Sequence, residues 1–80
     1  MIVKILGPGC ANCRNLEKNT RAALAELGVD ATVEKVTDYS EIAGYGVLKT
    51  PGLVVDEELV VSGRVPRPAE LAAVLLAHAR

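Results

Sequence analysis

Apolar residues recur along this chain in patterns that predict alternating strands and helices. Residues 2–6 form a short, β-branched run that a Gly-Pro-Gly segment ends, which is typical of a buried strand. From about Asn12 to Leu27 the apolar residues recur at three- and four-residue steps, which predicts a helix. Gly28 can end this helix in the left-handed cap conformation. Apolar and polar residues then alternate from Val29 to Val36, which predicts a second strand.

A short helix is predicted next. Asp38 and Ser40 are both suitable as its cap, and we expect the helical turn itself at residues 41–43. Glycines that follow weaken this segment, so the prediction is for one turn only. Residues 47–52 then lead, without a clear periodic pattern, into the last part of the chain.

The last part of the chain predicts a hairpin and a final helix. Two β-rich runs, at 53–55 and 59–61, flank a polar turn at 56–58, which predicts an antiparallel pair of strands. The turn lacks the glycine that a type I′ turn favours. Pro68 is well placed as the first residue of the final helix, and Arg80 falls in its last turn.

The predicted order is therefore β-α-β-α-β-β-α. The first two strands flank a helix and should be parallel, and the hairpin adds an antiparallel pair. The expected α/β fold is one mixed four-stranded sheet with helices on both faces. Eighty residues, half of them apolar, can fill one modest core, so we expect a single domain over residues 1–80.

Charge and hydropathy exclude several classes of function. The formal net charge is −1, whereas proteins that bind nucleic acid usually carry a basic excess. No charged leader precedes a long apolar stretch, and no apolar run approaches the roughly 20 residues of a membrane helix. We therefore expect a cytoplasmic protein that binds neither nucleic acid nor membrane. In a reducing compartment, a Cys-x-x-Cys pair is catalytic or metal-binding rather than structural.

The chemistry of this chain centres on its two cysteines, Cys10 and Cys13, at the junction between the first strand and the first helix. Cys13 shares the apolar face of the predicted helix, so we expect it to be buried. Cys10 falls where the helix begins, and the free N–H groups of a first turn stabilise a thiolate there. An exposed, activated sulfur beside a sheltered one suits dithiol–disulfide exchange, in which the first attacks and the second resolves.

Several stretches together resemble a known family. The arrangement is similar to the thioredoxin fold, and more closely to the small glutaredoxin-like proteins of bacteria and archaea called redox-active disulfide protein 2. The stretches that carry the resemblance are 9–13 (Gly-Cys-Ala-Asn-Cys), 16–19 (Leu-Glu-Lys-Asn), 50–56 (Thr-Pro-Gly-Leu-Val-Val-Asp) and 62–65 (Ser-Gly-Arg-Val). They extend over nearly the whole chain.

The resemblance implies a minimal thioredoxin fold and assigns roles to four residues. Cys10 would be the nucleophile and Cys13 the resolving thiol of a protein-disulfide reductase. Pro51 would be a cis-proline facing them, and Thr50 would present backbone groups to an extended substrate. The implied partners are a disulfide-containing protein and a thioredoxin reductase, and we expect a monomer with no cofactor and no metal. Lys4 stands where thioredoxins keep a buried acid.

Two alternatives remain open from the residues alone. Two thiolates at this spacing also suit a soft ion such as Cu(I), as in small metal chaperones, although those proteins end in a strand and this chain is predicted to end in a helix. Alternatively, the fold is a non-catalytic binding module in which the thiols are incidental.

Overall fold

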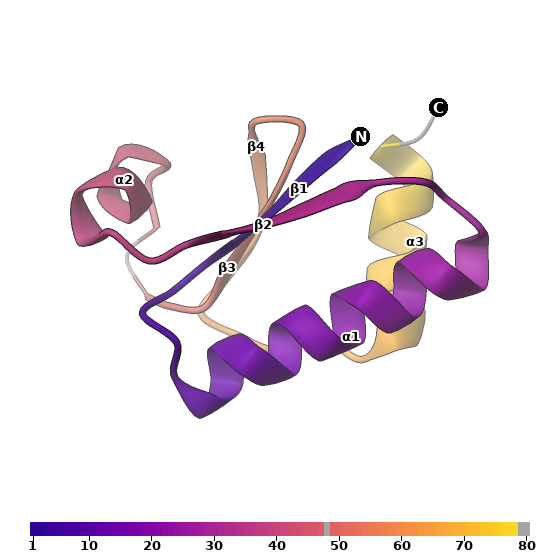
Figure 1. Cartoon of the computed structure of the whole chain (residues 1–80), viewed down its shortest axis with the longest axis horizontal. Coiled ribbons are helices and arrows are strands. Elements are labelled where there is room, and N and C mark those ends of the chain that lie inside the picture. The colour runs from indigo at the N-terminus through magenta and orange to yellow at the C-terminus, as the bar shows by residue number, and fades with distance from the viewer. Residues whose placement is uncertain (48, 79–80) are drawn as a thin grey trace.

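The computed structural model describes residues 1–47 and 49–78, so the predicted place of Arg80 lies outside the described residues. The elements follow the predicted order β-α-β-α-β-β-α (Figure 1). They are β1 (Ile2–Leu6), α1 (Ala11–Leu27), β2 (Thr32–Val36), α2 (Tyr39–Gly44), β3 (Gly52–Val55), β4 (Glu58–Ser62) and α3 (Pro68–His78).

The four strands form one mixed sheet in the order β2-β1-β3-β4. β1 pairs parallel with β2 and antiparallel with β3, and β3 pairs antiparallel with β4. The register places Leu6 opposite Gly52, and Gly52 opposite Ser62. The segments that follow β1 and β4 and the segment that precedes β3 therefore lie at the same end of the sheet.

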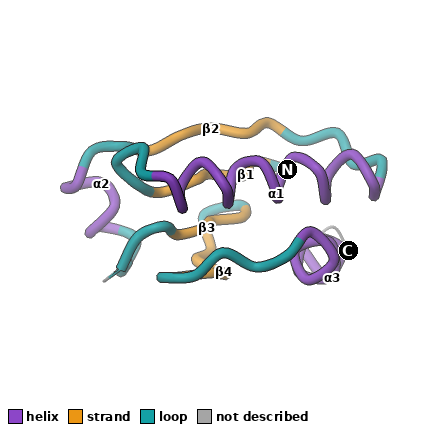
Figure 2. Tube along the Cα trace, turned by 90° about the horizontal axis from the view of Figure 1, so that it is seen from below, coloured by secondary structure: helices purple, strands orange, loops and turns teal. Residues whose placement is uncertain are grey.

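Helices cover both faces of the sheet, as predicted. α1 and α3 pack on one face and α2 on the other, with α2 and α3 at opposite ends of the molecule (Figures 1 and 2). Strand residues alternate between the two faces, so each face has its own core. The larger core, under α1 and α3, contains Val3, Ile5, Leu16, Ala23, Leu24, Leu53, Val55, Val61, Leu71 and Leu75. The smaller one, under α2, contains Leu6, Val36, Ile42, Val47 and Val54.

The hairpin turn differs from the prediction. It consists of two residues, Asp56 and Glu57, because Glu58 already belongs to β4. Both have positive φ, 48° and 70°, as a type I′ turn requires, although neither is glycine. A distant contact holds the turn: the Asp56 carboxylate accepts from the Ile2 N–H at 2.8 Å, and the Asp56 N–H donates to the Ile2 carbonyl at 2.8 Å. These contacts with β1 stabilise a conformation that the local sequence does not favour.

The second strand is shorter than predicted, since β2 begins at Thr32 rather than Val29. Its partner β1 begins opposite Thr32, so residues 29–31 have no strand to pair with. Gly28 ends α1 with φ 68°, and the Val29 N–H donates back to the Leu24 carbonyl at 3.2 Å. Val29 and Ala31 nevertheless pack against the larger core, as the alternation predicted.

The second helix is longer than the predicted turn at 41–43. Asp38 is its cap, with a carboxylate that accepts from the Ser40 N–H at 3.0 Å, and the helix continues through Gly44. Ile42 packs in the smaller core, where only 3% of its surface is exposed. This packing outweighs the low helix propensity of glycine, which acts only locally.

Candidate active site

The two cysteines lie at the start of α1 and are joined by a disulfide, with their Cα atoms 5.0 Å apart. Cys10 is exposed, whereas Cys13 exposes only 4% of its surface. The helical pattern predicted this difference, because Cys13 shares the face that carries Leu16 into the core. The pair therefore presents one sulfur to solvent and keeps the other beneath it.

Cys10 is the N-cap residue of α1, and its side chain takes the role of a capping group. Its backbone is extended, with φ −68° and ψ 168°, and its sulfur accepts from the Cys13 N–H at 3.2 Å. Its carbonyl accepts the first helical bond, from the Arg14 N–H at 3.0 Å. The first turn contains no acidic residue, so nothing there offsets the positive end of the helix dipole. This arrangement stabilises negative charge on the Cys10 sulfur when the disulfide opens.

Gly7 makes the space that the buried sulfur occupies. A Cβ atom at this position would overlap Cys13 Sγ and would lie 3.2 Å from Cys13 Cβ. The same Cβ would lie 3.8 Å from Thr50 Cβ, so Thr50 is a neighbour of this site. The sequence pattern marked Gly7 only as the residue that ends the first strand. Its packing role was missed because it depends on a contact with the next element.

Thr50 and Pro51 lie on the segment that enters β3, beside the end of β1. The Thr50–Pro51 peptide bond is cis, as the family resemblance implied. Pro51 is buried, and its carbonyl accepts from the Gly63 N–H at 2.8 Å, which ties this segment to the loop after β4. All four residues singled out in the sequence thus lie at one end of the sheet.

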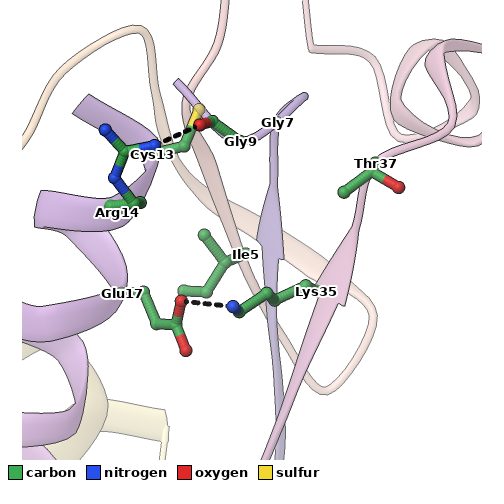
Figure 3. Close-up of a pocket in the computed structure, with 8 residues that line it drawn as sticks. All are labelled: Ile5, Gly7, Gly9, Cys13, Arg14, Glu17, Lys35 and Thr37. Atoms are coloured by element: carbon green, nitrogen blue, oxygen red, sulfur yellow. Dashed lines mark hydrogen bonds and ion pairs between the residues drawn. The ribbon is translucent and has the colours of Figure 1, made fainter. Parts of the chain in front are cut away.

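A small pocket opens beside the buried cysteine, between α1 and the ends of β1 and β2 (Figure 3). Its lining residues are Ile5, Gly7, Gly9, Cys13, Arg14, Glu17, Lys35 and Thr37. Arg14 borders it with a guanidinium that donates to the Gly9 carbonyl at 2.8 Å, and so holds the loop before Cys10. Cys13, and not Cys10, is the member of the pair that lines this pocket.

Glu17 forms a charged cluster at the far end of this pocket. Its carboxylate pairs with Lys35 at 3.2 Å and with Arg21 at 3.0 Å, and its side chain is only 16% exposed. Burial alone would raise the pKa of Glu17, but the hydrogen bonds from Arg21 and Lys35 outweigh it and hold that pKa below its usual value. The cluster connects α1 with β2. No local motif predicts the contact of Glu17 with Lys35, because Lys35 belongs to another element.

Lys4 stands where thioredoxins keep a buried acid. Its side chain lies on the face of the sheet that α2 covers, the same face as Leu6. Its ammonium group donates to Tyr45 Oη at 2.7 Å and to Glu57 Oε1 at 2.6 Å, while Tyr45 Oη donates to Glu57 Oε2 at 3.0 Å. The hydrogen bond from Lys4 to Glu57, followed by the one to Tyr45, raises the pKa of Lys4 well above its usual value. Lys4 therefore stays charged and links β1 with the hairpin turn.

Over residues 1–47 and 49–78, no three or more His, Cys, Asp or Glu side chains come together as a metal site would need. None of the helices in this part of the chain has both the length and the apolar character required to cross a bilayer.

The chain is similar in sequence to known proteins. A family model described as "Thioredoxin domain" matches residues 1–76. A protein named "Thioredoxin" from Methanothermobacter thermautotrophicus is 47% identical over 75 residues, which cover 94% of this chain and 97% of the relative. Another protein of that name, from Methanocaldococcus jannaschii, is 39% identical over 71 residues, or 89% of this chain and 81% of the relative. The span matched by the family model contains both cysteines and the cis peptide bond.

Proposed function

Because this chain belongs to the thioredoxin family, we propose that it is a thiol–disulfide oxidoreductase that acts on disulfides of protein substrates. The observation that carries the proposal is the pair of sulfurs at the start of α1. Cys10 is exposed, and its sulfur accepts a hydrogen bond from the Cys13 N–H. Cys13 is buried and is joined to Cys10 by the disulfide. Exchange needs such an accessible nucleophile with a second thiol in reach.

In the first step the reduced protein attacks its substrate. The Cys10 thiolate donates its electron pair to one sulfur of the substrate disulfide, and a Cys10–substrate disulfide forms. The other substrate sulfur leaves as a thiolate and takes a proton from solvent. The Cys13 N–H and the N-terminal end of α1 stabilise the Cys10 thiolate before the attack.

In the second step Cys13 resolves the mixed disulfide. Its thiol loses a proton to solvent, and its sulfur attacks Cys10 Sγ. The second substrate sulfur leaves as a thiolate and takes up a proton from solvent. The Cys10–Cys13 disulfide is restored, and two electrons have passed to the substrate. The Cα separation of 5.0 Å lies within the range that disulfides occupy, so the ring closes without a change of the backbone. Burial of Cys13 keeps other disulfides from reacting with it.

The segment before β3 is proposed to hold the substrate chain. Pro51 has no N–H of its own, and Thr50 precedes it beside Gly7 and the disulfide. An extended substrate segment can pair with backbone groups of Thr50 by strand addition, and these main-chain contacts do not themselves depend on the substrate's side chains. A thioredoxin reductase is the proposed source of electrons, because each cycle leaves the protein oxidised.

Reduction of insulin disulfides tests the proposal. With dithiothreitol or a thioredoxin reductase as electron donor, the protein should accelerate insulin precipitation, and the Cys10→Ser variant should lose this activity. The Cys13→Ser variant should instead accumulate a mixed disulfide with the substrate, which mass spectrometry detects. Equal rates for the protein and its Cys10→Ser variant would contradict the proposal.

The metal-binding alternative is tested on the same sample. Titration of the thiol pair against glutathione buffers should give one reversible two-electron transition. Uptake of Cu(I) that competes with a strong chelator, together with no insulin reduction, would favour a chaperone over an oxidoreductase.

A further inference from the structure

Three loops surround Cys10, and each brings a basic residue to the same end of the sheet. The register of Leu6 with Gly52 and of Gly52 with Ser62 places the loop after β1, the segment before β3 and the loop after β4 side by side (Figure 1). The basic residues on or next to these loops are Arg14, Lys49, Arg64 and Arg67, and all four are exposed.

Arg14 lies directly beside the nucleophile. It occupies the first turn of α1, and its guanidinium donates to the carbonyl of Gly9, the residue before Cys10 (Figure 3). Only one of its five N–H groups is used in this bond, so the group keeps donors for a carboxylate that approaches Cys10.

Lys49 is held in place by a glycine on the neighbouring loop. A Cβ atom at Gly63 would lie 3.0 Å from Lys49 Cβ and 3.6 Å from its Cδ, so the lysine stem extends across Gly63. Ser62 Oγ also donates to the Lys49 carbonyl at 3.5 Å. Lys49 immediately precedes Thr50 and Pro51, so it is the cation next in sequence to the segment proposed to hold the substrate.

These two cations have no carboxylate partner among the described residues. Among residues 1–47 and 49–78, carboxylates within salt-bridge distance engage Lys4, Arg21, Lys35 and Arg64, whereas Arg14, Lys18, Lys49 and Arg67 are not engaged. Of these four, Arg14 donates to the residue before Cys10 and Lys49 directly precedes Thr50. The distribution is asymmetric, since the other end of the sheet carries the acidic hairpin residues 56–58.

The carboxylates toward the Cys10 end have other partners or lie on α2. Glu17, which lines the same pocket as Arg14, pairs with Arg21 and Lys35. Asp38 caps α2 through the Ser40 N–H, and Glu70 pairs with Arg64 at 2.6 Å. Glu41 lies on the exposed side of α2, one turn beyond that cap.

We propose that this basic rim, formed by Arg14 and Lys49, selects substrates whose disulfide is flanked by acidic residues. The inference rests on the proposed function and specifies its substrate class. Carboxylates on either side of the substrate cysteine would meet Arg14 on the Cys10 loop and Lys49 on the Thr50 segment. Complementary charge of this kind raises the association rate more than it raises the affinity of the complex. Salt reduces this effect on the rate because it screens exposed charges.

Three peptides of equal length test this proposal. Each contains one internal disulfide, and the residues flanking its cysteines are glutamates, glutamines or lysines. At low ionic strength kcat/KM should be highest for the glutamate peptide and lowest for the lysine peptide, with about a tenfold difference between these two. Raising the salt to roughly 0.3 M should reduce the difference to about twofold, because screening shortens the reach of exposed charges.

Two matched variants identify the source of the preference. Lys49→Met keeps the stem that packs on Gly63 and removes the charge, so it should reduce the ratio between glutamate and lysine peptides about threefold. Ala25→Glu changes the net charge by the same one unit at the other end of α1, about 22 Å along the helix from Cys10, and should leave the ratio unchanged.

The outcomes separate the two proposals. Equal rates for all three peptides, or a faster lysine peptide, would overturn the substrate preference while the oxidoreductase function stands. A change of ratio in Ala25→Glu as large as that in Lys49→Met would also overturn it, since net charge would then be the cause. Failure to reduce any of the peptides or insulin would instead reject the proposed function.

Discussion

Gly7 and Cys13 pack together, and the absence of a side chain at Gly7 is what makes room for the Cys13 sulfur. The buried sulfur fills the space where a Cβ atom at Gly7 would stand, and Thr50 lies at the edge of the same space. Close packing leaves no room for even one added carbon here, because protein interiors have the density of organic crystals. Position 7 therefore controls where the resolving sulfur lies.

The substitution Gly7→Ala should displace Cys13 Sγ. We expect a loss of about 1–3 kcal/mol in the free energy of unfolding of the oxidised protein, as for other over-packed sites. Insulin reduction should slow in parallel, because the second step requires the Cys13 sulfur to approach Cys10. Urea unfolding and the insulin assay measure the two effects.

Gly44→Ala is the matched control for that substitution. Nothing lies within 4 Å of a Cβ atom at Gly44, which belongs to α2 and does not have a positive φ. The change should stabilise the protein by about 0.4–1 kcal/mol because alanine has less freedom to lose on folding. Equal stability of Gly7→Ala and wild type would contradict the packing argument.

At the scale of elements, α1 is held to the sheet by apolar packing and by one charged contact. Glu17 reaches from α1 to Lys35 on β2, with Arg21 completing the cluster one turn further along the helix. The partly buried carboxylate is surrounded by cations, so its ionised form is favoured in the folded protein. The contact between helix and strand therefore lies beside the pocket, and Cys13 lines the same pocket.

This connection predicts a pH dependence of stability. Because the pKa of Glu17 is lower in the folded protein than its ordinary value of 4.5, the ionised group stabilises the fold above that value. The contribution is lost as the pH falls through the lowered folded pKa. Glu17→Gln should thus destabilise the protein by about 1 kcal/mol near pH 7, and the difference should be smaller near pH 3, below the ordinary value.

Urea unfolding at both pH values measures this effect. Glu26→Gln, at an exposed site on the same helix, is the control and should change stability by less than about 0.5 kcal/mol. A loss in Glu17→Gln that persists undiminished at the lower pH would show that the ion pairs are not its cause.

At the scale of the whole molecule, two cores of unequal size share one sheet. The larger core joins α1, α3 and three strands, whereas the smaller core depends on α2 and the loop that follows it. A domain of 80 residues has a total stability of about 4–12 kcal/mol, so one large cavity in the main core removes much of it. The position of α3 against α1 is thus a condition for the fold as a whole.

Neighbouring leucines on α3 test this dependence. Leu75 is fully buried and Leu76 is 46% exposed, although the two are adjacent in the sequence. Leu75→Ala should destabilise the protein by about 2–5 kcal/mol, because it leaves a cavity between α3 and the sheet. Leu76→Ala should change stability by less than about 1 kcal/mol. Thermal unfolding of the two variants under the same conditions measures the difference between them.

Much of the candidate site could be predicted because its signals are local. The exposure of Cys10 and the burial of Cys13 follow from a helical period that begins at the Cys-x-x-Cys pair, and both were confirmed. Asp38, one of the two residues predicted as a cap, is the cap of α2, and the predicted helix start at Pro68 was confirmed, since capping depends on residues within one turn. The clustering of Thr50 with Gly7 is visible only in the folded chain.

The sequence by itself determined the order of the elements, their approximate limits and the chemistry at the start of α1, because periodicity, capping and turn residues act over a few neighbours. Tertiary structure alone decided the hairpin turn, which depends on Ile2, 54 residues from Asp56. It also decided the start of β2, the ion pair of Glu17 with Lys35, and the placement of Arg14 and Lys49 at the same end of the sheet. These features depend on strand register and on contacts between distant segments, which do not exist until the sheet has formed.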